Sequence, residues 1–178
     1  MFGPLIRRST GASASVLLVM LGSCAGGGDG AATDAAVVDL ADSGAGPERL
    51  VEQRWDAYWD ARVASENSGR LGEAFTEVAS GKALEAQTRR LRNYAHHDLV
   101  RVGQPEFRDV RVRVSEDSAT VLACMNADDW TAIAEDRPWS ARKYGWELTG
   151  SVMKQVDGTW LVVDEMSTED VADMGATC

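Results

Sequence analysis

Two short clusters of residues carry side chains that could transfer protons or hold a metal ion. The two histidines of the chain are adjacent in His96-His97-Asp98, and two carboxylates stand beside an indole in Asp128-Asp129-Trp130. Neighbouring residues on a helix point about 100° apart, so two such imidazoles rarely share one ion. No HExxH or CxxC spacing accompanies them. We therefore expect the histidines to end a helix, one partly buried and one solvated, and we expect no metal site.

The aspartate pair could do acid–base chemistry only in a particular setting. A carboxylate packed against an indole can have a raised pKa and serve as a general base. Asp128 and Asp129 would need to face a cavity for that role, whereas adjacent aspartates in a polar loop are usually solvated. No GxSxG motif, phosphate-binding loop or dinucleotide fingerprint is present. The sequence therefore assigns no catalytic residue and no cofactor, and an enzymatic function is not favoured.

Residues 1–23 have the features of an export signal. Arg7 and Arg8 give a basic start, and residues 16–21 are apolar but too few to span a bilayer as a helix, which takes about 20 residues. Leu21-Gly22-Ser23-Cys24 resembles the lipobox of bacterial lipoproteins. The resemblance implies that Cys24 becomes the N-terminus and carries acyl chains such as palmitate, which hold the protein on the extracytoplasmic face of the cell membrane. The alternative is an ordinary signal peptide followed by an unrelated cysteine.

Two further cysteines, Cys124 and Cys178, remain after Cys24 is assigned to lipid. Export would place them in an oxidising compartment, where free thiols are uncommon. We expect a disulfide between them. The alternative is two free thiols, one buried and one at the end of the chain.

The charge balance excludes some partners. Eighteen basic residues oppose 28 acidic ones, which gives a formal net charge of −10 at pH 7. Nucleic-acid binding needs a basic surface, so no nucleic-acid partner is expected. An electrostatic hold on anionic lipid is disfavoured for the same reason.

The rest of the chain divides into a tether and one domain. Residues 24–46 are rich in Gly, Ala, Asp and Ser and contain no aromatic residue, so we expect a flexible tether. Residues 47–178 begin with apolar residues at three- and four-residue steps, which predicts a helix from Pro47 to the break at residues 67–69. Two more helices are expected at about 71–78 and 83–97.

The period then changes to that of strands. Valines alternate with charged residues in 109–114, and an apolar segment follows in 120–125. A long strand is expected at 146–156, and residues 160–163 are expected to return antiparallel to it. Asp157-Gly158 between the last two is a strong hairpin signal. Residues 126–143 read as a polar stretch, and residues 167–178 as an acidic tail. Helices followed by meandering strands indicate an α+β domain.

This order resembles the NTF2-like, cystatin-like cone superfamily, and more narrowly the small exported lipoproteins of actinobacteria built on that fold. The residues that carry the resemblance are Tyr58-Trp59, the segment 118–124, the Trp146 strand, the segment 157–162 and Cys178. The resemblance implies N-terminal helices packed on a curved antiparallel sheet over residues 47–178. Catalytic relatives, the ketosteroid isomerases and polyketide cyclases, use a pocket aspartate as general base.

Aromatic residues of the predicted helices and strands could line an apolar pocket or form the core: Trp55, Tyr58, Trp59, Tyr94 and Trp146. We expect a non-catalytic domain of the cell envelope that binds a small apolar ligand or an envelope protein. An acid–base enzyme of the isomerase or cyclase type is the alternative. A third hypothesis is an accessory subunit that pairs through an open sheet face.

Overall fold

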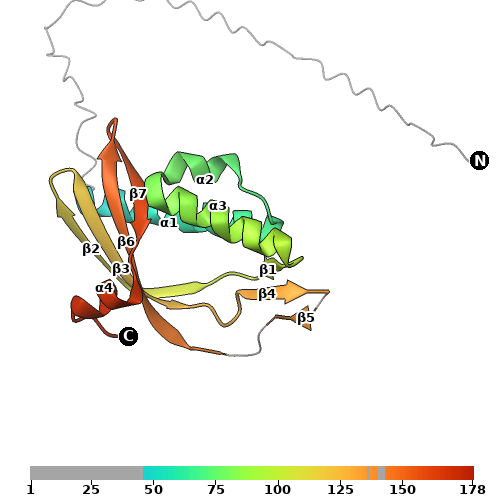
Figure 1. The fold of residues 1–178 in the computed structure, drawn as a ribbon. Coiled ribbons are helices and arrows are strands. Elements are labelled where there is room, and N and C mark those ends of the chain that lie inside the picture. The colour runs from blue at the N-terminus through green and yellow to red at the C-terminus, as the bar shows by residue number, and fades with distance from the viewer. Residues whose placement is uncertain (1–45, 136, 140–142) are drawn as a thin grey trace, which may run out of the picture. The chain divides into compact units, whose positions relative to one another are not determined.

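The computed structural model describes residues 46–135, 137–139 and 143–178. The expectations for the export signal, for Cys24 and for nearly all of the tether lie outside these residues. In chain order the elements are α1 (Pro47–Ser68), α2 (Glu73–Val78), α3 (Gly81–His96), β1 (Val100–Val102), β2 (Glu106–Ser115), β3 (Ser118–Asn126), β4 (Thr131–Ala134), β5 (Arg137–Pro138), β6 (Trp146–Val156), β7 (Thr159–Glu165) and α4 (Thr168–Asp173) (Figure 1).

The main sheet is an antiparallel meander with strand order β2-β3-β6-β7, and a smaller sheet has the order β1-β4-β5. Asp157 and Gly158 join β6 to β7 with φ values of 50° and 79°, the positive pair that a tight hairpin requires. The register shifts between Arg108 and Arg111 in β2 and again between Val152 and Met153 in β6. Such irregularities bend strands, and the sheet is visibly curved in Figure 1.

Helices α1, α2 and α3 pack on one face of the main sheet, where the core lies. Pro47 begins α1, and Gly69 ends it in the left-handed conformation. The buried face of α1 presents Trp55, Tyr58 and Trp59, each at most 4% exposed, to apolar residues of the sheet. Their rings meet edge-on at centroid distances of 5.8–6.1 Å. Large aromatic contacts of this kind supply much of the apolar burial of a small domain.

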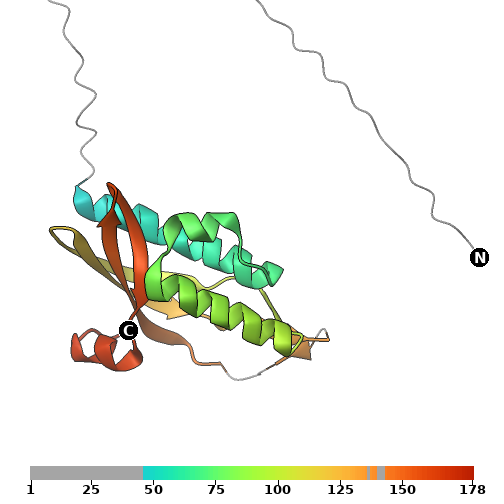
Figure 2. The ribbon, with the colours of Figure 1, turned by 45° about the horizontal axis from the view of Figure 1, so that its top comes forward.

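The opposite face of the sheet is covered by α4, which Figures 1 and 2 both place away from the other helices. Ser167 and Asp170 form a capping box at its first turn. Gly150 lies beneath it: a Cβ added there would be 2.7 Å from Met166 Sδ and 3.0 Å from Val171. The absence of a side chain at position 150 therefore lets the helix sit against the sheet.

The structure confirms the α+β class and the packing of N-terminal helices on a curved antiparallel sheet. Two expectations need correction. The polar stretch 126–143 contains the short strands β4 and β5. Residues 131–133 of β4 pair with β1, and β5 pairs with the other edge of β4. The acidic tail forms α4: Ser167 and Asp170 cap its first turn, where acidic residues are favourable, and Val171 is buried. Within the described part of the chain, no helix is long and apolar enough for a membrane span.

Candidate functional site

A cavity of about 430 Å³ lies beside the C-terminal end of α3, the small sheet and the start of β6. Its lining includes three residues that reach into the protein interior, namely Tyr94, Arg101 and Trp130, and two carboxylates nearer the surface, Asp128 and Glu147. Two other hollows of similar volume, beside Asp56 and beside Thr88, contact none of the buried charges described below. This cavity is therefore the candidate functional site.

Glu66 of α1 is fully buried and forms the centre of a charged network beneath this cavity. One of its oxygens lies 3.1 Å from Arg62 Nε and 3.3 Å from Arg90 Nη1. The other lies 3.3 Å from Arg101 Nε and accepts a 3.4 Å hydrogen bond from the Tyr94 hydroxyl. A buried carboxylate is tolerated only when it is paired in this way.

Glu165 at the end of β7 is the second carboxylate of the network. It pairs with Arg62 at 2.9 Å and with Arg90 at 3.0 Å, and it accepts a 2.6 Å hydrogen bond from the Tyr58 hydroxyl. Burial by itself would raise the pKa of Glu165, but Arg62 and Arg90 outweigh it and hold that pKa below its ordinary value. Burial by itself would lower the pKa of Arg62, but Tyr58 and the two carboxylates outweigh burial and raise that pKa above its ordinary value. Burial raises the pKa of Tyr58, which stays a hydrogen-bond donor.

Arg101 and Trp130 form the floor of the cavity. The guanidinium of Arg101 stacks 4.0 Å above the centre of the Trp130 ring, and its Nε also donates a 3.0 Å hydrogen bond to Tyr94. Trp130 is 3% exposed, and its indole N–H donates to Asn67 at 3.1 Å. The guanidinium of Arg62 lies 5.7 Å from the same ring. Stacking and hydrogen bonds thus fix two cations against one indole.

The outer part of the cavity is more exposed. Trp139 and Tyr144, which line it, are 61% and 59% exposed. Asp128 Oδ1 accepts backbone N–H groups from Tyr144 at 2.9 Å and from Gly145 at 3.3 Å. Glu147 is exposed on β6. We call Asp128 and Glu147 the rim carboxylates.

The five aromatic residues proposed for a pocket are distributed over three environments. Trp55, Tyr58 and Trp59 lie in the core cluster under α1, because the face of the helix that carries them packs on the sheet. Trp146 lies under the guanidinium of Arg108 at 4.1 Å. Tyr94 lines the cavity. The structure therefore does not bring these five together.

The histidines and the second aspartate lie at the surface. His96 and His97 are both exposed at the end of α3, with ring centroids 4.9 Å apart, so the expectation that one of them is partly buried is wrong. Asp129 is 85% exposed and lies 3.8 Å from Lys143 Nζ. Among the described residues, no cluster of three His, Cys, Asp or Glu side chains could hold a metal ion.

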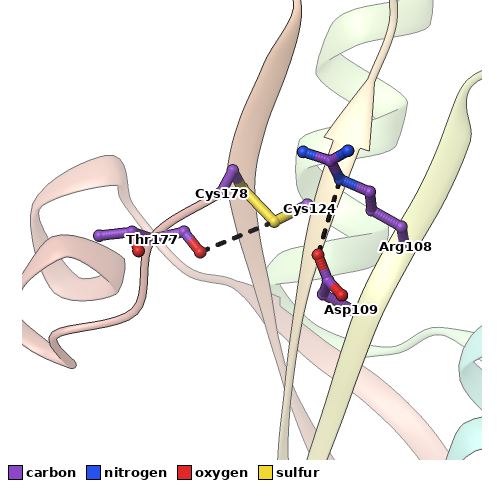
Figure 3. Close-up of a disulfide and its surroundings, with 5 residues drawn as sticks. All are labelled: Arg108, Asp109, Cys124, Thr177 and Cys178. Carbon is purple, nitrogen blue, oxygen red and sulfur yellow. Dashed lines mark hydrogen bonds and ion pairs between the residues drawn. A yellow bond between two sulfur atoms is a disulfide. The ribbon is translucent and has the colours of Figure 1, made fainter.

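Cys124 of β3 and Cys178 form a disulfide, with their Cα atoms 5.5 Å apart (Figure 3). The Cα separation lies within the usual range for such bonds. Cys124 is 1% exposed and lies on the outer face of the sheet, on the same side as α4. The bond therefore fixes the C-terminal residue to the main sheet.

The charged network was not anticipated from the sequence. Its signal was available, because Arg62 and Glu66 stand four residues apart and continue the buried face that runs through Trp55 and Trp59. A charged pair on the apolar face of a helix indicates a buried ion pair. The contributions of Arg101 and Glu165 could not be found in this way, since they come from distant strands.

Neither a protein-family model nor a curated protein matches this chain. Among solved structures, an NTF2-like protein of unknown function from Shewanella oneidensis is similar, at 14% identity over 64% of this chain and 95% of that one, with a TM-score of 0.39. An NTF2-like family member from Streptomyces avermitilis, provisionally assigned as a dehydratase, is 14% identical over 66% and 91%, with a TM-score of 0.41. A protein from Xanthomonas campestris, provisionally assigned as a polyketide cyclase, is 12% identical over 70% and 96%, with a TM-score of 0.37. Similarity at this level does not extend to activity.

Proposed function

We propose that this protein is an exported lipoprotein, attached through Cys24 to the extracytoplasmic face of the cell membrane, whose α+β domain binds a small molecule without transforming it. The lipobox-like Leu21-Gly22-Ser23-Cys24 and the basic and apolar segments before it support the anchor. The cavity floored by Arg101 and Trp130 is the observation that supports the binding role. Small-ligand sites typically combine aromatic walls with a few fixed polar groups, in volumes of about 300–1,000 Å³.

The anchor can be tested by metabolic labelling with a clickable palmitate analogue. The wild-type chain should incorporate the label, and Cys24→Ala should not. Cys124→Ser serves as the matched control, because it also removes a cysteine but should retain the label. Equal labelling of wild type and Cys24→Ala would contradict the proposed anchor.

The binding role can be tested on the chain from residue 24 with Cys24→Ser, secreted through an unrelated export signal. Native mass spectrometry of this protein, followed by solvent extraction, should reveal a co-purified small molecule. Placing a large side chain in the cavity, as in Ala132→Trp, should remove that molecule. The control is Ala86→Trp on α3, outside the cavity. A carried molecule unaffected by Ala132→Trp would show that binding occurs elsewhere.

An acid–base enzyme is the second candidate, because Asp128 lines the cavity. Asp128 Oδ1 accepts hydrogen bonds from two backbone N–H groups, which favours a structural role in fixing the loop instead. The extracted molecule, incubated in deuterated water with wild type and with Asp128→Asn, distinguishes the two. Exchange of a carbon-bound proton by wild type but not by Asp128→Asn would support the enzyme. No exchange by either supports a binding protein.

A further inference from the structure

We infer that the floor of the cavity recognises a carboxylate, and that the preferred ligand is a monocarboxylate with an apolar or aromatic body. This inference rests on the proposed binding function and names the ligand class of the same cavity. It begins with a charge count in the buried network. Three guanidinium groups, those of Arg62, Arg90 and Arg101, face two carboxylates, those of Glu66 and Glu165. One positive charge is left over where water access is limited.

The surplus charge is available at Arg101. Arg62 and Arg90 each contact both carboxylates, whereas Arg101 contacts only Glu66, through Nε. No hydrogen bond within the described part of the chain engages its two terminal nitrogens. The side chain is 24% exposed and lines the cavity. An arginine fork with free terminal nitrogens matches a carboxylate bidentately.

The fork is held in place before any ligand arrives. Trp130 supports its face at 4.0 Å, and Tyr94 and Glu66 fix its Nε. A fixed side chain loses little rotamer freedom on binding, so more of the interaction energy contributes to affinity. Arg62, beside the same indole, adds positive potential at the floor.

The rest of the cavity defines the remainder of the ligand. Met125 and the exposed rings of Trp139 and Tyr144 line the same cavity and provide apolar and aromatic surface for the body of the ligand. The rim carboxylates, Asp128 and Glu147, place negative charge in the outer part of the cavity. They disfavour a second anionic group on the ligand, because like charges at short range repel. A dicarboxylate or a phosphate dianion therefore fits less well than a monocarboxylate.

Calorimetric titration of the Cys24→Ser chain from residue 24 with three probes tests this inference. The probes are 2-naphthoate, the neutral 2-naphthamide, and naphthalene-2,6-dicarboxylate. We expect naphthoate to bind at least tenfold more tightly than the amide, as is usual for a hydrogen bond to a charged group. We expect the dicarboxylate to bind more weakly than naphthoate. Equal binding of naphthoate and naphthamide would overturn the inference and leave the proposed function intact.

Two substitutions assign the effect to the floor. Arg101→Lys keeps the charge but not the fork, and should reduce naphthoate affinity while changing naphthamide affinity little. Arg92→Lys, exposed on α3 outside the cavity, is the control. The wild-type comparison of naphthoate with naphthamide stands even if Arg101→Lys unfolds. Absence of naphthoate binding up to millimolar concentration would also overturn the inference, while the extraction experiment judges the proposed function separately.

Discussion

Glu66 has no contact with water, and both of its oxygens are bound by side chains from three elements. Such a group helps to specify the fold, because its partners come from α1, α3 and β1 and must all be in place for both oxygens to be bound. Removing one member of a buried ion network leaves the others unpaired, and that penalty usually exceeds the net worth of the interaction itself.

Glu66→Gln should therefore destabilise the domain strongly. We expect a loss of about 3–5 kcal/mol in the free energy of unfolding, since three arginines lose their shared carboxylate. Urea denaturation measures this loss. The matched control is Glu85→Gln, which removes an exposed carboxylate 3.9 Å from Arg89 and should cost less than about 0.5 kcal/mol. Similar losses in the two variants would show that the network contributes no more than a surface pair.

Glu165 makes the stability of the domain depend on pH on the acidic side. Its pKa in the folded protein lies below the ordinary value of 4.5, since Arg62 and Arg90 outweigh the effect of burial. Its contribution is fully present above that value and is lost as the pH falls through the folded-state pKa. Between pH 7 and pH 3, the unfolding free energy of wild type should fall more than that of Glu165→Gln.

The exposed Glu77 provides the control for this pH dependence. Glu77→Gln should show the same loss between pH 7 and pH 3 as wild type, because the Glu77 side chain has no partner among the described residues. If Glu165→Gln has the same acid dependence as wild type, the ion pairs of Glu165 do not set it.

The environment of a residue could be predicted from the sequence only where it follows from a local pattern. The burial of Trp55, Tyr58 and Trp59 follows from their helical spacing, but their placement in the core instead of a pocket depends on how α1 is rotated on the sheet. Arg101 could not be recognised, because its partners lie 35 and 7 residues earlier in the chain, at Glu66 and Tyr94. Long-range pairing of this kind has no local signature.

At the scale of elements, the helices and long strands could be predicted from the spacing of apolar residues and from the residues that interrupt helices. The Asp157-Gly158 hairpin and the ends of α1 lie where turn chemistry predicts them. Helix α4 was missed although Ser167 and Asp170 have the spacing of a capping box, because its composition is mostly acidic. Strands β4 and β5 were missed because short strands rarely show a clear alternation.

The attachment of the tail to the sheet should contribute measurably to stability. The disulfide joins residues 54 positions apart, and in the chain-entropy model a loop of this size stabilises by about 4 kcal/mol. Cys178→Ser should therefore lower the free energy of unfolding by up to that amount, measured by urea denaturation without reductant. Reduced wild type should match the variant. Unchanged stability would mean that packing alone already holds the tail on the sheet.

At the scale of the whole molecule, the sequence predicts a division between tether and domain. Deleting residues 30–42 should leave the melting temperature of the Cys24→Ser chain almost unchanged, because their composition cannot form a packed core. Differential scanning calorimetry measures this. A deletion of equal length within α1 would unfold the domain and so calibrates the assay. A drop of several degrees on deleting residues 30–42 would show that they pack against the domain.

The stacking of Arg101 on Trp130 also has an optical consequence. The chain contains six tryptophans, and Trp130 has a guanidinium fixed at 4.0 Å from its ring centre. A charge at that distance shifts the energy of the excited indole, so any molecule that neutralises or moves Arg101 changes the emission spectrum. Replacing the exposed Trp139 by Phe would remove the other tryptophan of the cavity. In that variant the protein's own fluorescence reports occupancy of the cavity floor, without any attached dye.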